Sequence, residues 1–162
     1  MSKAVTLVNV PNKTSNFYPA DDQWILVQLP LKASTAMTEG AALSVEISSN
    51  TTTGNYTVSG VENASGNDFV GILAEPIVST DADYATAGKL KAVWIPRCST
   101  AKAYFTVTAG TFTAVDVGKT VEITSGSIGL SVDTAGKGAR ITDYISSTRG
   151  KCVFCMPNTE TA

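Results

Sequence analysis

Histidine is absent from this chain of 162 residues, and charged residues make up only 16% of it. Without histidine the chain cannot form a Ser-His-Asp or Cys-His catalytic group, nor a metal site that uses imidazole. Lys and Arg number 12 against 14 Asp and Glu, whereas a nucleic-acid-binding protein needs a marked basic excess. These shortages favour a structural or binding role and indicate no nucleic-acid partner.

The chain is also poor in cysteine and lacks long hydrophobic runs. Its three Cys cannot all pair within one chain, so we expect free thiols and synthesis in a reducing cytoplasm. No apolar stretch approaches the roughly 18 residues of a membrane-spanning helix, and the first residues lack the pattern of a signal peptide. We therefore expect no contact with a membrane.

Thr, Ser, Val, Ala and Gly dominate the chain, a composition typical of β-proteins. After Thr38, apolar and polar residues alternate in short segments bounded by Gly, Asn, Ser or Asp, and no segment has the apolar spacing of a regular helix. We predict an all-β fold, a small β-barrel or sandwich of short antiparallel strands. The alternation is clearest at 43–48, 56–59, 105–108 and 121–124.

A weak internal repeat indicates two related modules. Three short segments of the first half recur in the second half in the same order, each pair sharing its Gly, Lys or apolar positions. They predict repeat units at 38–97 and 114–157, produced either by duplication or by two similar sheets in one domain. The matched segments are 40–48 with 118–124, 71–73 with 140–142, and 91–95 with 151–155.

Residues 1–37 differ from the rest because two segments, 4–10 and 24–27, are apolar on both faces of a predicted strand. A strand of this kind must be covered on both faces, either by the protein's own sheets or by a partner. We therefore divide the chain into an N-terminal arm with a leading strand, 1–37, and a β-domain, 38–162. The alternative is that residues 4–29 complete the protein's own sheets.

Cys152-x-x-Cys155 has the spacing of a zinc ligand pair or a redox motif. A zinc site needs four ligands, and without histidine only Cys98 remains. Side chains three apart on a strand point to opposite faces, so the two sulfur atoms would diverge. We interpret these cysteines as small buried side chains, with an inter-subunit zinc site or disulfide as the alternative.

No other cluster has the spacing of a catalytic or cofactor site. Asp81 and Asp83 alternate as calcium ligands do, but the remaining positions of a calcium loop are missing, so a solvated turn is the simpler interpretation. Gly136-Lys137-Gly138 precedes no helix and predicts a hairpin turn, not a phosphate-binding loop. We expect no catalytic residue, no cofactor and no bound metal.

Glycine-bounded segments of the second half share one pattern with counterparts in the first. They are 114–123, 126–128, 138–141 and 150–153 in the second half, and 71–76 and 85–95 in the first. This pattern resembles that of bacteriophage head decoration (capsid cement) proteins, which are built from small β-barrel modules. The resemblance spans about residues 38–157, and Lys119 departs from it because members often carry an acidic residue at that turn.

The resemblance implies a non-enzymatic protein that binds the outer surface of a phage capsid and stabilises contacts between capsomers. It also implies synthesis in the host cytoplasm, a place in the virion, and the major capsid protein as partner. Such proteins are often homo-oligomers, either trimers or dimers.

In such a protein the apolar N-terminal arm would engage the major capsid protein or a neighbouring subunit. An extended segment can add to the edge of another sheet, where main-chain hydrogen bonds give affinity and alternate side chains give specificity. The candidate interface residues are Val5, Leu7, Val8, Val10, Phe17, Tyr18 and Trp24.

Two other functions fit the same composition. Another virion or surface β-module, such as a head fibre base, a tail component or an adhesin domain, would have a similar sequence. A carbohydrate-binding module would need aromatic side chains aligned on one exposed face, whereas Trp94 and Tyr104 fall in predicted core strands.

Overall fold

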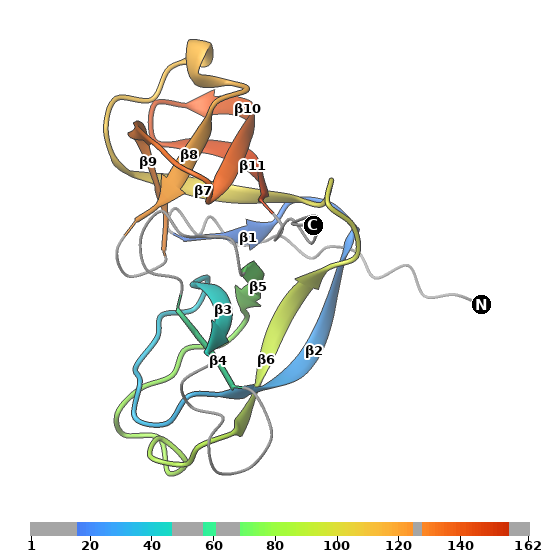
Figure 1. Ribbon diagram of the computed structural model, residues 1–162, viewed down its shortest axis with the longest axis vertical. Helices are drawn as coiled ribbons and strands as arrows, with labels where there is room; N and C mark the ends of the chain where they lie inside the picture. The colour runs from blue at the N-terminus through green and yellow to red at the C-terminus, as the bar shows by residue number, and fades with distance from the viewer. Residues whose placement is uncertain (1–15, 47–56, 61–68, 125–127, 156–162) are drawn as a thin grey trace, which may run out of the picture.

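The computed structural model describes residues 16–46, 57–60, 69–124 and 128–155. Over these residues the chain is all-β, which confirms the predicted fold class. Its strands form two sheets, and the described helical structure is the short 3-10 helix η3 (Ala114–Asp116). Figure 1 shows the two sheets as two small modules stacked along the long axis of the molecule.

The first module is a closed barrel in the strand order β2-β4-β3-β5-β6. Neighbouring strands are antiparallel except β2 and β4, which are parallel and meet at Leu31 and Val58. The strands are β2 (Trp24–Leu31), β3 (Ala42–Glu46), β4 (Thr57–Gly60), β5 (Phe69–Leu73) and β6 (Lys89–Pro96).

The second module is a sheet in the order β1-β7-β11-β10-β8-β9, with a further parallel pairing between β7 and β9. Its first member, β1, comes from the chain ahead of the first module. The strands are β1 (Tyr18–Pro19), β7 (Lys102–Ala109), β8 (Thr120–Ile123), β9 (Leu130–Ala135), β10 (Ala139–Ser146) and β11 (Arg149–Phe154).

The strands of one module pair in the same order as those of the other. In sequence order, β2 to β6 correspond to β7 to β11. The parallel pair also recurs, with Leu31 beside Val58 in the first module and Val107 beside Leu130 in the second. The protein therefore contains two related modules.

Two glycines mark the same point in each module. Gly40 and Gly118 have positive φ angles of 82° and 94°, a conformation that favours glycine. Their N–H groups donate to the carbonyl oxygens of Leu73 and Ile141, at 2.8 and 2.9 Å. Leu73 therefore corresponds to Ile141, and the sequence match between these strands is one residue out of register.

The repeated unit is longer than the segments 38–97 and 114–157 that the sequence predicts. It begins with β2 in the first module and with β7 in the second, two strands that share no evident sequence pattern. β2 pairs with β6 along its whole length. The leading strand of region 1–37 is therefore a wall of the first barrel.

Four aromatic rings join the two modules. Phe69 of β5 stacks on Phe154 of β11 with ring centroids 3.8 Å apart, and the rings of Phe17 and Trp24 meet Phe154 edge-on. All four side chains are buried. Because aromatic pairs contribute about 0.5–1.5 kcal/mol each beyond their buried area, this cluster stabilises the contact between the modules.

The segment that precedes β2 contacts both modules. The Phe17 N–H donates to the carbonyl oxygen of Gly40 in the first module at 3.1 Å. In the second module β1 pairs with β7, and Trp24 Nε1–H donates to the carbonyl oxygen of Lys102 at 2.9 Å. These residues therefore belong to the folded body of the protein.

Gly136-Lys137-Gly138 does not form the predicted hairpin. β9 and β10 lie on opposite sides of β8, so the chain crosses the end of β8 between them. Gly136 and Gly138 donate N–H to carbonyl oxygens of β8. A Cβ at Gly138 would lie 2.8 Å from the backbone N of Ile123, so this close crossing requires glycine.

Candidate binding surfaces

Three of the predicted interface residues lie in the described part of the chain. Phe17 and Trp24 are 0% and 6% exposed. Tyr18 is half-buried, and its hydroxyl donates to Glu39 Oε1 at 2.8 Å. The remaining four lie outside the described residues: Val5, Leu7, Val8 and Val10.

Phe17 and Trp24 are therefore removed from the predicted interface, because their rings fill the contact between the modules. The apolar pattern around Trp24 indicated that this strand is covered on both faces. The second module supplies part of that cover. This agrees with the alternative prediction, in which this region completes the protein's own sheets. The sequence left both sources of cover open because nothing local distinguishes them.

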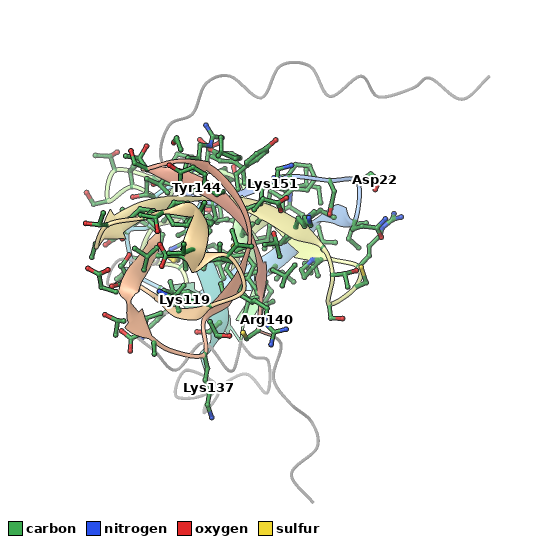
Figure 2. All side chains as sticks on the ribbon, turned by 90° about the horizontal axis from the view of Figure 1, so that it is seen from above. Asp22, Lys119, Lys137, Arg140, Tyr144 and Lys151 are labelled. Atoms are coloured by element: carbon green, nitrogen blue, oxygen red, sulfur yellow. The ribbon has the colours of Figure 1, made fainter. Side chains whose placement is uncertain are left out.

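Exposed apolar side chains lie on two elements that contact each other, the η3 turn and β10. Val115 and Val117 are 81% and 43% exposed, and Tyr144 and Ile145 are 41% and 49% exposed. We call Val115, Val117 and Tyr144 the η3 patch, because the side chain of Ile145 points to the opposite face of β10 from that of Tyr144. Figure 2 looks down on the second module and shows Tyr144 at its rim, away from Lys137, which projects into solvent. Grouped apolar residues of this kind mark interaction surfaces.

A buried carboxylate holds the turn that presents these valines. Asp116 Oδ2 accepts hydrogen bonds from the N–H and Oγ1–H of Thr113 at 2.8 and 2.9 Å, and Lys119 Nζ donates to Oδ1 at 2.6 Å. The Lys119 bond, followed by the two Thr113 bonds, holds the pKa of Asp116 below its ordinary value. The turn is therefore most stable with Asp116 ionised.

Tyr144 connects the η3 patch to the core of the second module. Its ring packs on Phe112 with centroids 5.0 Å apart, and Phe112 packs on Phe105 at 5.4 Å. Phe112 is 1% exposed and Phe105 is 0% exposed. Because protein cores are closely packed, the patch rests on a rigid support.

Several charged side chains of the second module are engaged in local pairs. Lys102 Nζ contacts Asp143 Oδ2 at 2.9 Å, and the hydrogen bond from Thr142, followed by that from Lys102, lowers the pKa of Asp143. Arg149 and Lys151 both lie over one tyrosine ring of β7. This arrangement differs from the aligned basic surface that binds a phosphate backbone.

An open groove of about 420 Å³ lies on the first module between segments 36–38 and 76–79. A β-bridge between Met37 and Ile77 joins the two segments. The groove lining has no ionisable side chain, so it offers contacts but no acid or base. Its residues are Ala36, Met37, Thr38, Pro76, Ile77, Val78 and Ser79.

Asp81 and Asp83 lie in a turn before β6, where a lysine occupies the space between them. Lys91 Nζ is 3.9 Å from Asp81 Oδ2 and 3.5 Å from Asp83 Oδ2. Asp81 Oδ2 also accepts the N–H of Val78. Over the residues that the structure describes, no group of three or more Cys, Asp or Glu is arranged to hold a metal ion.

The three cysteines are free thiols. Cys152 is fully buried in β11, and Cys155, just beyond the strand, is half-buried. Burial raises the pKa of both thiols above the ordinary value. They therefore stay protonated at neutral pH and behave as small apolar groups.

The η3 patch was not predicted from the sequence. Val115 and Val117 lie in a segment that carries the resemblance. Their exposure depends on the turn that Asp116 holds, and no apolar periodicity in the sequence predicts that turn. Tyr144 and Ile145 are neighbours on one strand, so their side chains point to opposite faces. Two adjacent apolar residues on one predicted strand are the sequence signal that could have indicated an exposed apolar side chain there.

No helix in the described residues is long and apolar enough to span a membrane. Comparisons of the chain with models of protein families, with curated proteins and with solved structures found no match. Its function is therefore inferred from its own residues and their geometry.

Proposed function

We propose that this protein decorates the outer surface of a bacteriophage capsid, where it stabilises contacts between capsomers without catalysing a reaction. The observation that carries the proposal is the position of the segments that resemble decoration proteins. They lie at matching turns and strands of two related modules. Val117 and Gly118 form the turn before β8, Gly138 leads into β10, and Gly150 lies in β11. In the first module, Gly71 lies in β5.

Two of these glycines are structural requirements of their modules. A Cβ at Gly150 would lie 2.5 Å from the carbonyl oxygen of Asp143. A Cβ at Gly71 would overlap the carbonyl oxygen of Trp94. Glycine at these positions lets neighbouring strands approach closely. The residues that carry the resemblance therefore belong to the framework of both modules, which supports a shared architecture with the decoration proteins.

The η3 patch is the surface that we assign to the shell, because it is apolar, exposed and rigidly supported. Fully burying an exposed Val side chain contributes roughly 1.5–3 kcal/mol, so a single copy would bind weakly through this patch. A trimer or dimer would occupy several sites of the shell at once and bind more tightly. The N-terminal arm would add a contact to the major capsid protein or to a neighbouring subunit.

Cosedimentation with empty heads tests the proposal. Purified protein is mixed with expanded and with unexpanded empty heads of the phage whose genome encodes it, and the bound protein is measured in each pellet. We expect binding to expanded heads, as the resemblance to decoration proteins implies. Absence from both pellets would contradict the proposal, and binding to isolated tails or fibres would favour another virion role.

A pair of variants tests the contribution of the η3 patch. Val115→Asp places a charge on the patch and should weaken binding to expanded heads at least about tenfold, because a buried unpaired charge is strongly unfavourable. Leu90→Asp, at an apolar residue of the first module that is 61% exposed and lies outside the groove, is the matched control. Equal binding by the two variants would exclude the η3 patch as the shell contact.

A further inference from the structure

β2 has one fully paired edge and one largely unpaired edge among the described residues. On the first edge it pairs with β6 from Trp24 to Leu31, and on the second it meets β4 only at Leu31. The side chains of Leu26 and Gln28 are exposed, that of Leu26 to 53%. Figure 1 shows β2 on the outer side of the lower module, with β6 on its inner side.

The main-chain groups of Leu26 and Gln28 point away from β6. Gln28 lies opposite Ala92. The Ala92 N–H donates to Glu75 Oε1 at 2.7 Å, and its carbonyl oxygen accepts the Ala74 N–H at 2.9 Å, both on the side of β6 away from β2. Since hydrogen-bonded and non-hydrogen-bonded residues alternate along an antiparallel pair, Gln28 and Leu26 present their N–H and C=O groups to the unpaired edge.

The register of the two modules identifies the counterparts of these residues in β7. Leu26 corresponds to Lys102, and Gln28 corresponds to Tyr104. In the first module Leu73 lies opposite Val93, and Val93 lies opposite Val27. In the second module Ile141 lies opposite Cys152, and Cys152 lies opposite Ala103.

In β7 the corresponding edge is occupied by the segment that precedes β2. Tyr104 pairs with β1. The carbonyl oxygen of Lys102 accepts hydrogen bonds from the Ala20 N–H at 2.8 Å and from Trp24 Nε1–H at 2.9 Å. The Lys102 N–H donates to Asp21 Oδ2 at 2.8 Å. A short segment of this chain therefore covers the outward main-chain groups of β7. The equivalent groups of β2 face outward.

We propose that this edge of β2 is a strand-docking site and that residues 4–10 of a second copy of the chain bind there. The segment 4–10 is apolar on both faces, as the site requires. Leu26 is exposed on one face of β2, and Ile25 and Val27 are only half-buried on the other. Main-chain hydrogen bonds to Leu26 and Gln28 supply affinity, and burial of apolar side chains on both faces adds to it.

The position of Asn16 favours a second copy over the chain's own arm. Asn16 Nδ2 donates to the carbonyl oxygen of Glu39 at 2.6 Å, just before β3. In the barrel, β4 separates β3 from β2 on one side, and β5 and β6 separate them on the other. The described chain therefore begins beside the start of β3, and β4 lies between β3 and the open edge of β2. An extended segment 11–15 spans about 17 Å, which is enough to place residues 4–10 on a neighbouring molecule.

Hydrogen exchange of the full-length protein, measured together with its sedimentation, tests this proposal without any capsid. We expect an oligomer that dissociates on dilution. The amides of Leu26 and Gln28 should exchange roughly a hundredfold more slowly in the oligomer than in the diluted monomer, because docking closes their hydrogen bonds. This result does not depend on shell binding, so the two proposals fail separately.

Two full-length variants locate the docking partners. Leu7→Asp with Val8→Asp places a charge on each face of the arm, and Gln28→Pro removes the outward N–H of the edge. Proline is tolerated where a strand N–H faces an open edge, and Pro30 already lies two residues further along the same edge. Both variants should be monomeric with fast-exchanging amides at Leu26, whereas the control Gln28→Thr, which keeps the N–H, should remain oligomeric.

Three results would overturn the proposal. A monomer with slowly exchanging amides at Leu26 and Gln28 would show that a segment of the same chain covers the edge. An oligomer in which these amides exchange rapidly would show that another surface joins the copies. A monomer in which they exchange rapidly at every protein concentration would show that the edge stays open.

Discussion

The two modules have the same order of strand pairings but are completed in different ways. In the second module β1 covers the outer edge of β7, whereas among the described residues the corresponding edge of β2 is covered only at Leu31. The same segment of chain that covers β7 also packs Phe17 and Trp24 between the modules. The difference shows that two modules with the same strand order need not have their equivalent edge strands, here β2 and β7, covered in the same way.

The largest expected effect comes from the ring that both modules share. Phe154→Ala removes the partner of Phe69, Phe17 and Trp24, and should lower the free energy of unfolding by about 3–5 kcal/mol. Because these rings form the contact between the modules, urea unfolding should separate into two transitions. Far-UV circular dichroism and tryptophan fluorescence, followed in the same titration, measure both effects.

Phe112→Ala is the matched control for this variant. Phe112 is 1% exposed, and its ring contacts are Phe105 and Tyr144, both in the second module. We expect a similar loss of stability without separation of the two transitions. If Phe154→Ala unfolds in a single transition like the control, the aromatic cluster is not what couples the modules.

The two equivalent glycine turns provide a second comparison. Gly118→Ala should cost about 1–2 kcal/mol, the strain of a positive φ, because nothing lies within 4 Å of the added Cβ. At Gly40 the Cβ would lie 2.5 Å from Asn16 Cβ and 2.9 Å from the Phe17 carbonyl oxygen. Gly40→Ala should therefore cost a further 1–3 kcal/mol or so from overpacking.

Urea unfolding of both variants measures this difference. Equal losses at Gly40 and Gly118 would mean that Asn16 and Phe17 yield without cost. The segment before β2 would then be only loosely held on the first module. A larger loss at Gly40 shows that this segment makes the two turns unequal.

Local patterns predicted the strands but not all of their partners. The alternation at 43–48 and 121–124 corresponds to β3 and β8. The sequence match aligned Val45 with Val121, whereas the strand pairings make Val45 the counterpart of Ile123, so this match is two residues out of register. The correspondence of β2 with β7 depends on pairings between residues far apart in the chain, and no local pattern records it. The matches of β5 with β10 and of β6 with β11 are each one residue out of register, because a short apolar segment does not determine register.

The candidate surface shows the same limit. The apolar character of 24–27 predicted cover on both faces, but its burial depends on Phe69 and Phe154, which come from two other strands. The η3 patch combines residues from a turn and from β10, and only the fold brings them together. A single sequence supplies local periodicity, whereas the covering of a face is decided by distant strands.

A smaller difference between the modules should depend on pH. Asp116 has a lowered pKa in the folded protein, and its counterpart in the first module is Thr38, which has no charge. A lowered pKa gives stability that is present above the ordinary value of 3.8 and is lost as the pH falls below it. Asp116→Asn should therefore be less stable at neutral pH and lose less stability on acidification than the parent protein.

Urea midpoints from neutral pH down to below 3.8, the ordinary pKa, measure this effect. Lys119→Met removes the strongest cause of the lowered pKa and should flatten the acid limb in the same direction. Asp143, whose pKa is also lowered, contributes a remaining acid sensitivity in both variants. An acid limb that is unchanged in Asp116→Asn would show that the turn does not depend on this carboxylate.

The smallest expected effect is an exchange of residues between equivalent positions. Cys152 of β11 and Val93 of β6 occupy the same place in their modules, and both are 0% exposed. Because the Cys152 thiol stays protonated and acts as an apolar group, Cys152→Val should change the free energy of unfolding by less than about 1.5 kcal/mol. Cys152→Ser, which buries a hydroxyl in the same place, should cost roughly 1–3 kcal/mol. If the valine variant is as unstable as the serine variant, the two positions are packed differently despite their common register, and the correspondence between the modules holds for the backbone alone.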